Sequence, residues 1–259
     1  MRILPFLLLL SVLLLQSCNK KAQDSQDQAA IIEFELASFE QKSASCATDT
    51  LRCATIALSY PVAQGLSEAA NAINDSIYWY VRVGAFMADP STPIPDDLTA
   101  IADTFIHNYE NFLQESPDYE IGWAIETTGD VVYNSSKVIA IELSTYSFMG
   151  GAHPNANANL LNFDPKTGKK LTLNDLVTDT DKLAQLVEAK FRQAKGLASD
   201  ADLGEAGYFW GEGFKLPENF SVTAEGLYFF YNAYEAAAYA EGVTEFVIKN
   251  EELNGILKK

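Results

Sequence analysis

Two helical patterns placed between strand-like segments limit the folds that this chain can adopt. Residues 68–87 and 98–115 carry apolar side chains at helical spacing. Ser67 can cap the first helix, and Asp96 or Asp97 can cap the second. We therefore expect two consecutive amphipathic helices that pack one face each against a sheet built from the flanking segments.

The flanking segments have the alternating or β-branched patterns that are typical of strands. Expected strands are 31–39, 52–60, 121–128, 131–133, 138–148, 159–164, 220–223, 227–231 and 243–249. Pro61 should end the second strand, Gly129 and Asp130 should form a turn, and helices are expected at 180–196 and 251–258. The predicted class is α+β: mixed or antiparallel sheets, helices packed on one face, and two adjoining subdomains, 31–118 and 119–259.

The amino terminus predicts export. Residues 1–17 hold one arginine followed by an apolar run too short for a comfortable membrane span, as in a signal peptide. Cys18 follows in a sequence that resembles a bacterial lipobox, so we expect it to carry lipid; an ordinary signal peptide with a chance cysteine is the alternative. Residues 18–30 are polar and are interpreted as a flexible tether. The expected location is the bacterial cell envelope, lipid-anchored at the periplasmic face or the cell surface of the outer membrane.

Charge excludes one class of partner. The chain has 18 Lys and Arg against 35 Asp and Glu, a net charge of -17. A nucleic-acid-binding protein needs a basic surface, so we expect no nucleic acid partner. Acidity of this kind serves solubility, and it also favours encounter with basic proteins.

Cys46 and Cys53 are the two cysteines beyond the predicted signal peptide and lipobox. An exported protein meets an oxidising compartment, and the polar Thr48-Asp49-Thr50 between them suits a turn. We predict a disulfide that closes a hairpin. A metal site formed by the same pair is the alternative, but both histidines of the chain are distant in sequence.

Two segments do not fit a simple helix or strand pattern. The first holds Gly150 and Gly151 followed by His153 and Asn155. The second, residues 208–239, contains eleven aromatic residues, which are more often core than binding surface. Within it, three aromatic residues lie among glycines in an expected loop: Phe209, Trp210 and Phe214.

Several of these motifs together resemble a paired bacterial envelope domain of unknown function. The residues concerned are Tyr146 to Asn155 (YSFMGGAHPN) and Asn162 to Leu176 (NFDPKTGKKLTLNDL). The C-terminal half of the pattern lies in 219–246, and residues upstream at Tyr60-Pro61 resemble the partner domain that precedes it. The family occurs in the ectodomain of a lysozyme-sensing anti-sigma factor and ahead of the catalytic domain of a peptidoglycan deacetylase. The resemblance implies binding of an extracytoplasmic ligand, either a lysozyme-like basic protein or a wall glycan (peptidoglycan), by a stand-alone lipoprotein.

Catalysis is not expected, and no cofactor or metal is assigned. His153 could act as a base with Asp164 or Glu142, but no GxSxG or HExxH motif accompanies it, and a hydrogen bond to neighbouring backbone is the simpler interpretation. Asp164 with Thr167 and Gly168 could form a cation loop, but a hairpin turn fits better. The acids Glu235, Glu241 and Glu245 could pair for glycoside hydrolysis, or lie in solvent. An uncharacterised envelope hydrolase and a purely structural envelope component remain alternative functions.

The ligand surface is expected at the two glycine-interrupted loops, 150–155 and 204–215. The candidate residues are Gly150, Gly151, His153, Asn155, Phe209, Trp210 and Phe214. Exposed aromatic rings beside acids such as Glu205 and Glu212 suit a sugar face or a basic protein. The alternative is that Trp210 folds back onto the core.

Overall fold

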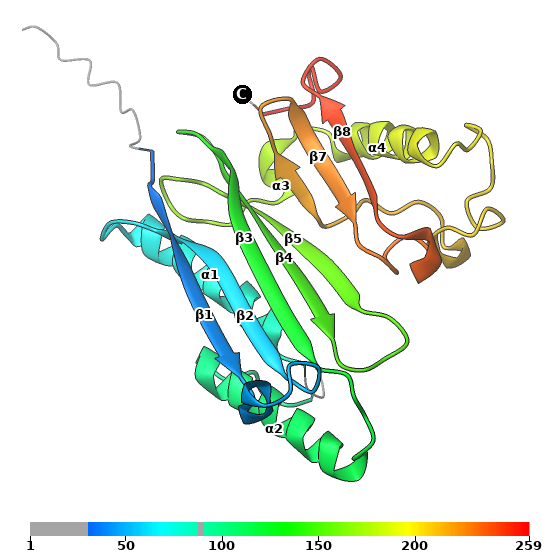
Figure 1. The fold of residues 1–259 in the computed structure, drawn as a ribbon. Coiled ribbons are helices and arrows are strands. Elements are labelled where there is room, and N and C mark those ends of the chain that lie inside the picture. Colours follow the sequence, from blue (N-terminus) through cyan, green and yellow to red (C-terminus); the bar gives the residue numbers. More distant parts are fainter. Residues whose placement is uncertain (1–30, 88–90, 259) are drawn as a thin grey trace, which may run out of the picture.

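The protein, studied as a computed structural model, is described for residues 31–87 and 91–258. The predicted signal peptide, Cys18 and the tether lie outside the described residues. Figure 1 shows two sheets, one of five strands and one of three. The strands are β1 (Phe34–Lys42), β2 (Thr55–Ala63), β3 (Ala124–Asn134), β4 (Ile139–Phe148), β5 (Asn155–Phe163), β6 (Phe220–Val222), β7 (Gly226–Tyr231) and β8 (Thr244–Lys249). The predicted α+β class with two sheet subdomains is confirmed.

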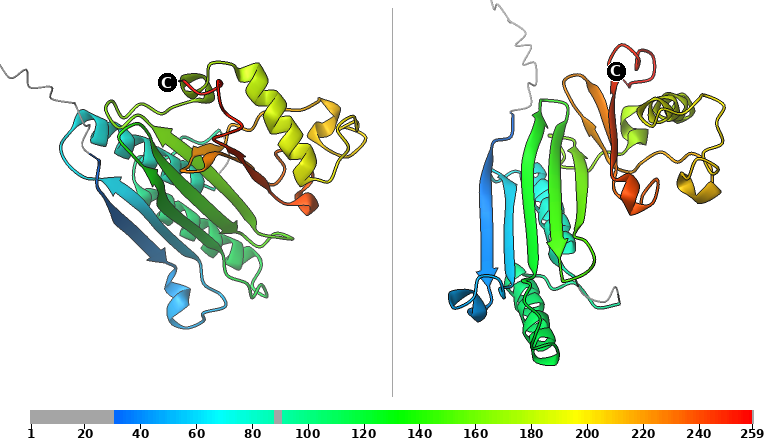
Figure 2. Two further views of the ribbon diagram at one scale, coloured as in Figure 1. Left: turned by 90° about the horizontal axis from the view of Figure 1, so that it is seen from above. Right: turned by 45° about the vertical axis from the view of Figure 1, so that its right-hand side comes forward.

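The five-stranded sheet follows the sequence order β1-β2-β3-β4-β5. Its neighbours are antiparallel except for β2 and β3, which are parallel because two helices cross over between them. These helices, α1 (Glu68–Ala85) and α2 (Leu98–Glu115), cover one face of the sheet (Figure 2). The side chain of Ser67 accepts a hydrogen bond from the Ala70 amide, and that of Asp97 accepts one from the Ala100 amide. Both helices therefore start where the capping pattern predicts.

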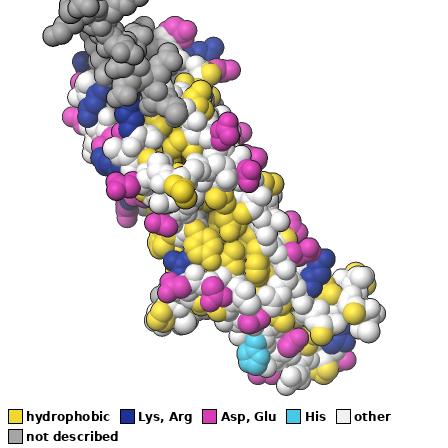
Figure 3. Space-filling view, turned by 90° about the vertical axis from the view of Figure 1, so that its left-hand side faces the viewer, with side chains coloured by type: hydrophobic (Ala, Val, Ile, Leu, Met, Phe, Trp, Pro, Cys, Tyr) yellow, Lys and Arg dark blue, Asp and Glu magenta, His cyan; other side chains and the backbone are white. Residues whose placement is uncertain are grey.

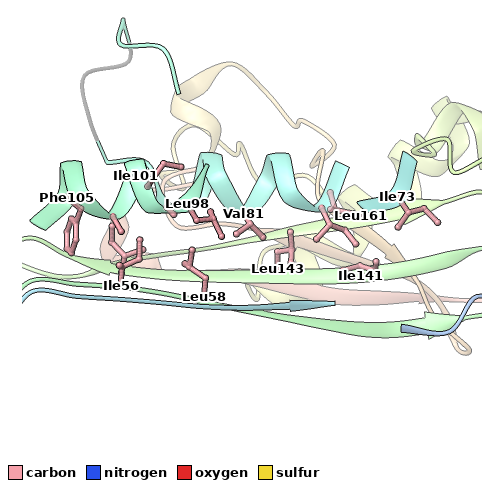
Figure 4. Packing of buried hydrophobic residues seen from close by; sticks show 14 of the residues in the cluster. Ile56, Leu58, Ile73, Val81, Leu98, Ile101, Phe105, Ile141, Leu143 and Leu161 are labelled. Atoms are coloured by element: carbon pink, nitrogen blue, oxygen red, sulfur yellow. The ribbon is translucent and has the colours of Figure 1, made fainter. Parts of the chain in front are cut away.

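The main core lies between these helices and the sheet (Figure 4). Helical side chains such as Ile73, Val81 and Ile101 point toward sheet side chains such as Leu58 and Ile141. These residues are all at most 1% exposed. Burial of each such side chain contributes about 1.5–3 kcal/mol, which accounts for the strict helical spacing in the sequence.

The three-stranded sheet has its own helix, α4 (Thr180–Ala194), and a separate core. A short helix, α3 (Leu173–Leu176), precedes it. Three asparagines join the two sheets. Asn162 on β5 bonds to Phe220 and Val222, while Asn219 and Asn232 bond to the β5 backbone at Ala158.

The division between the sheets falls after β5. Strands β3, β4 and β5, which the sequence analysis grouped with the C-terminal subdomain 119–259, lie in the same sheet as β1 and β2. The boundary at 118 follows a change in helix and strand pattern. It does not mark a change of sheet, because β3 pairs in parallel with β2 across the helical connection.

Two expectations about the ends of strands were wrong. Gly129 and Asp130 do not form a turn but continue β3, where a Cβ on Gly129 would come within 2.6 Å of the Leu143 side chain. Glycine is thus required there for close packing. Pro61 does not end β2, which continues to Ala63. Proline has no N–H to donate, but β3 pairs with β2 only as far as Ser59, so no hydrogen bond between β2 and β3 is lost at Pro61.

The C-terminal segment 251–258 forms turns and not the expected helix. Gly255 has a φ of 78°, and the Lys258 amide donates to the Leu176 carbonyl while the Thr178 amide donates to the Ile256 carbonyl. Backbone pairing with residues 176–178 therefore replaces helical hydrogen bonding. Within the described ranges, no helix combines the length and apolar character that are needed to cross a bilayer.

The disulfide prediction is confirmed. Cys46 and Cys53 are bonded, with their Cα atoms 4.6 Å apart, in the connection between β1 and β2. The connection also contains a short 3-10 helix, Ala44–Ala47. The bridge thus closes the hairpin at the end of the sheet where β1 finishes, far from the start of that strand (Figure 1).

Candidate ligand-binding site

The loop between β4 and β5 depends on Gly150. This residue has a φ of 81°, and a Cβ at this position would collide with the Tyr119 hydroxyl and approach the Trp123 indole nitrogen. Gly151 does not share the positive φ. Only one glycine of the pair is therefore needed for backbone conformation, and it brings the loop down onto the aromatic side chains before β3.

His153 fixes this loop to a distant segment. Its Nδ1 lies 2.8 Å from the Pro154 carbonyl oxygen, so this nitrogen carries the proton and donates. Its ring stacks on Tyr239, with centroids 3.8 Å apart and planes at 17°. The Tyr239 hydroxyl also donates to the Pro154 carbonyl, at 3.0 Å. The imidazole thus bonds to neighbouring backbone, as the simpler interpretation predicted, and it also docks the loop on residues 239–241.

The three aromatic residues of the second loop have different surroundings. Phe209 is 2% exposed and its ring lies 5.0 Å from Phe191 in a core cluster, and Phe214 packs against the same cluster. Trp210 is 63% exposed. The Phe209 ring is therefore withdrawn from any ligand in this structure, the Phe214 ring is partly buried, and the Trp210 ring is accessible.

Backbone strain concentrates in the same region. Phe209, Trp210 and Tyr234 have φ values of 52°, 50° and 67°. Among the described residues, these are the non-glycine positions with positive φ, and all three are aromatic. Such conformations cost energy and are retained where the surroundings or a function require them. For Trp210 the strained backbone turns the indole outward while the preceding ring stays in the core.

Residues 234–239 bring the two predicted loops together. The Ala236 carbonyl accepts a hydrogen bond from the Phe209 amide at 2.7 Å, and Tyr239 contacts the loop at 150–155. Tyr234 is 53% exposed, with its ring centroid 5.5 Å from that of Tyr239. We refer to His153, Trp210, Tyr234 and Tyr239 as the aromatic rim. Asn155, at the start of β5, is exposed beside it.

Acidic side chains surround the aromatic rim. Glu205 and Glu241 are exposed, and Glu212 pairs with Lys215, whose hydrogen bond lowers the pKa of the Glu212 carboxyl. Burial raises the pKa of Glu235, although a hydrogen bond from the Asn232 amide to this carboxyl opposes the shift. The rim therefore combines ring faces with negative charge.

A cavity of about 240 Å³ lies near the rim, on the face of the five-stranded sheet opposite the helices. Its lining includes Glu126, Tyr146, Ala156, Phe230 and Val243. Tyr146 and Val243 are 39% and 46% exposed. Strand alternation could have placed Tyr146 on this face. It could not have shown that β7 and the residue before β8 would form a second wall.

The other candidate residues are engaged within the fold. The Asp164 carboxylate accepts hydrogen bonds from the Lys166 and Thr167 amides, as in a hairpin turn. Glu142 accepts from the Ser144 hydroxyl, and Glu245 accepts from the Tyr228 hydroxyl at 2.5 Å. No group of three His, Cys, Asp or Glu suited to a metal ion occurs in the part of the chain that the structure describes.

Fold and site together define an α+β protein of two sheets with an exposed aromatic rim at the junction of two loops. Two parts of the chain match known family models, one mostly within the five-stranded sheet and its helices and one mostly within the three-stranded sheet. Residues 47–156 match the family described as "Deacetylase PdaC", and residues 174–251 match the "Protein of unknown function (DUF3298)" family. The resemblance inferred from the GGAHP and NFD motifs is thereby confirmed.

Solved structures of DUF3298 family proteins have the same fold. One from Pseudomonas aeruginosa PAO1 is 23% identical with a TM-score of 0.64, and the match covers 89% of this chain and 96% of that one. One from Bacteroides fragilis NCTC 9343 is 17% identical with a TM-score of 0.66, covering 90% and 96%.

Sequence relatives include the immunogenic proteins MPB64 of Mycobacterium bovis and MPT64 of Mycobacterium tuberculosis. Each is 27% identical over 126 residues, which is 46% of this chain and 51% of the relative. The chain thus spans about half the length of the curated relatives it matches. None of these names assigns a substrate or ligand to the aromatic rim.

Proposed function

We propose that this chain is a non-catalytic, lipid-anchored protein of the cell envelope that binds an extracytoplasmic ligand through the aromatic rim. The observation that supports binding most directly is the exposure of Trp210 and Tyr234 on strained backbone. The exposed part of each ring contributes little to the fold, although the backbone is strained, and it can stack on a ligand.

The surroundings of His153 favour binding over catalysis. One face of its ring is covered by Tyr239, and its Nδ1–H is used by the Pro154 carbonyl. A general base needs access to a substrate proton, and here the imidazole holds a loop in place. The match to a family named for a deacetylase covers residues 47–156, so deacetylation is the alternative activity to test.

A basic, lysozyme-like protein is the first candidate ligand. The exposed acids beside the rim and the net charge of -17 favour a cationic partner. Wall glycan is the second candidate, because sugar rings stack on exposed Trp and Tyr.

Binding of the soluble 30–259 fragment to c-type lysozyme and to purified peptidoglycan tests the proposal. Trp210→Ala should weaken binding about 10-fold or more, the loss typical of a central aromatic contact. Trp79→Ala, which removes another exposed tryptophan at 47% exposure on α1, is the matched control and should bind normally. Both variants should melt within a few degrees of the parent protein.

Equal binding by the Trp210 variant would refute the site. A drop of many degrees in its melting temperature, with neither ligand bound by the parent, would mean that the aromatic loop serves only the fold. Release of acetate from peptidoglycan by the parent protein would contradict the non-catalytic assignment.

A further inference from the structure

A second cavity, about 610 Å³, lies at the other end of the molecule from the aromatic rim. Four stretches border it: the β3–β4 hairpin, the stretch 164–176 that follows β5, the turn between β6 and β7, and the C-terminal segment. Its floor is apolar. The floor residues are Val138, Leu171, Leu176, Val222, Leu227 and Leu253.

The mouth of this cavity is lined by Lys137, Lys166 and Lys258, all exposed, and we call the whole the lysine pocket. Among the residues that the structure describes, Lys137 and Lys166 form no ion pair. The Lys258 ammonium donates to a neutral partner, the Asn174 carbonyl. Three cationic groups are therefore presented together by a chain that is strongly acidic overall.

The two carboxylates of the lysine pocket do not cancel this charge. Asp164 is turned toward the amides of its own hairpin turn. Asp175 caps α3 and forms an ion pair with a fourth lysine, Lys169, at 2.6 Å. The lining thus has three lysines against two carboxylates, one of which is already paired with Lys169, and it retains a net positive charge above an apolar floor.

The location of the lysine pocket indicates what it can meet. The start of β1, the β3–β4 hairpin and the C-terminal end all lie at one end of the molecule in every view (Figures 1 and 2). On the side seen in Figure 3, several Lys and Arg side chains lie near this upper end among Asp and Glu side chains, and an apolar patch lies in the middle of that side. The described chain begins at this end, at Ile31, so an anchor in the amino-terminal part would be attached to the domain from this side.

We propose that the lysine pocket binds an anionic phospholipid of the membrane, with the headgroup phosphate between Lys137, Lys166 and Lys258 and the start of an acyl chain over the apolar floor. The proposal adds to the envelope function a surface that sets the orientation of the domain on the bilayer. It does not depend on which ligand the aromatic rim binds.

Vesicle co-sedimentation tests the proposal. The chain from Asn19 onward is suitable because it lacks the cysteine that would carry lipid and keeps all the residues of the three described core clusters. It should bind phosphatidylcholine vesicles that contain phosphatidylglycerol and not vesicles of phosphatidylcholine alone. Lys137→Gln with Lys166→Gln should weaken this binding roughly 30-fold, since each lysine at an anionic surface contributes a factor of roughly five.

The control variant removes the same charge elsewhere. Lys42→Gln with Lys215→Gln changes two exposed lysines, one at the far end of β1 and one in the loop that carries Trp210. It should bind the anionic vesicles within about twofold of the parent, because neither lysine lies near the lysine pocket.

Two outcomes would overturn the proposal. Equal losses in both variants would mean that only net charge matters, and failure of the parent to bind anionic vesicles at low salt would exclude the site.

A competition experiment with a soluble lipid tests the apolar floor. Dihexanoyl-phosphatidylglycerol should compete with vesicles for the lysine pocket at concentrations where glycerol phosphate does not. Equal competition would remove the acyl chain from the proposal. Lysozyme and peptidoglycan binding should be unchanged in the variant that carries Lys137→Gln and Lys166→Gln.

Discussion

Asn162 is the residue whose loss should uncouple the two sheets most directly. Its side chain is 1% exposed on β5. The amide Nδ2 donates to the Phe220 carbonyl at 2.7 Å, and Oδ1 accepts from the Val222 amide at 2.8 Å. These two bonds join β5 of the large sheet to β6 of the small one, across about sixty residues of sequence.

Asn162→Ala should destabilise the protein by about 2–5 kcal/mol. It leaves two backbone groups without partners in a buried position, and each such group costs about 1–3 kcal/mol. For a domain of this size that free energy corresponds to a fall of roughly 4–20 °C in melting temperature. Urea unfolding followed by circular dichroism and by tryptophan fluorescence gives the free energy of unfolding and tests whether both sheets unfold together.

Asn157→Ala is the matched control, because it lies on the same strand and its Oδ1 is buried without a hydrogen-bond partner. This variant should change stability by less than about 1 kcal/mol, since truncation removes an unsatisfied polar atom. The reasoning would be refuted if Asn162→Ala cost no more than Asn157→Ala. It would also be refuted if the loss at Asn162 left the urea midpoint unchanged.

Other parts of the fold give further predictions. Replacing Cys46 and Cys53 by serine should lower the free energy of unfolding by about 2.5 kcal/mol, the entropy of a short closed loop, as measured by urea unfolding. Gly168→Ala should destabilise by about 1–3 kcal/mol, since φ is 70° and a Cβ would strike the Ala69 carbonyl; a normal melting temperature would contradict this. Burial raises the pKa of Glu235, so its charge disfavours folding above that pKa. Glu235→Gln should therefore melt higher than the parent at pH 7, with the difference vanishing below about pH 4.

Sequence patterns located the helices well because their signals are local. The capping side chains of Ser67 and Asp97 and the helical spacing fix the starts of α1 and α2 without reference to the rest of the chain. The disulfide was equally predictable, since two cysteines separated by seven residues in a chain with a predicted export signal leave few alternatives. Such features depend on residues that are close in sequence.

Features that depend on contacts between residues far apart in the sequence could not be predicted from the sequence. Gly129 resembles a turn residue, yet Pro61 and Leu143 pack against it too closely for any side chain. The adjacent residues Phe209 and Trp210 have the same class of side chain, but one is buried and the other exposed. Only the position of Phe191 on α4 and the strained backbone decide which ring enters the core.

The lysine pocket and the aromatic rim lie at opposite ends of β4. Lys137 is two residues before this strand, and Gly150 is two residues after it. A ten-residue strand spans roughly 30 Å, which is beyond the range at which exposed charges interact at physiological salt. If the lysine pocket rests on a membrane, the aromatic rim points away from it and is free to bind.

This geometry predicts that the two surfaces act independently. A variant that combines Trp210→Ala with the Lys137→Gln and Lys166→Gln changes should lose vesicle binding as the lysine variant does and ligand binding as the Trp210 variant does. Effects at sites so far apart add within about 0.5 kcal/mol, or roughly twofold in affinity. Titration of each variant with vesicles and with lysozyme measures both effects. A change in ligand affinity of more than a few fold in the lysine variant alone would show that the surfaces are coupled, and the two-ended arrangement would then be wrong.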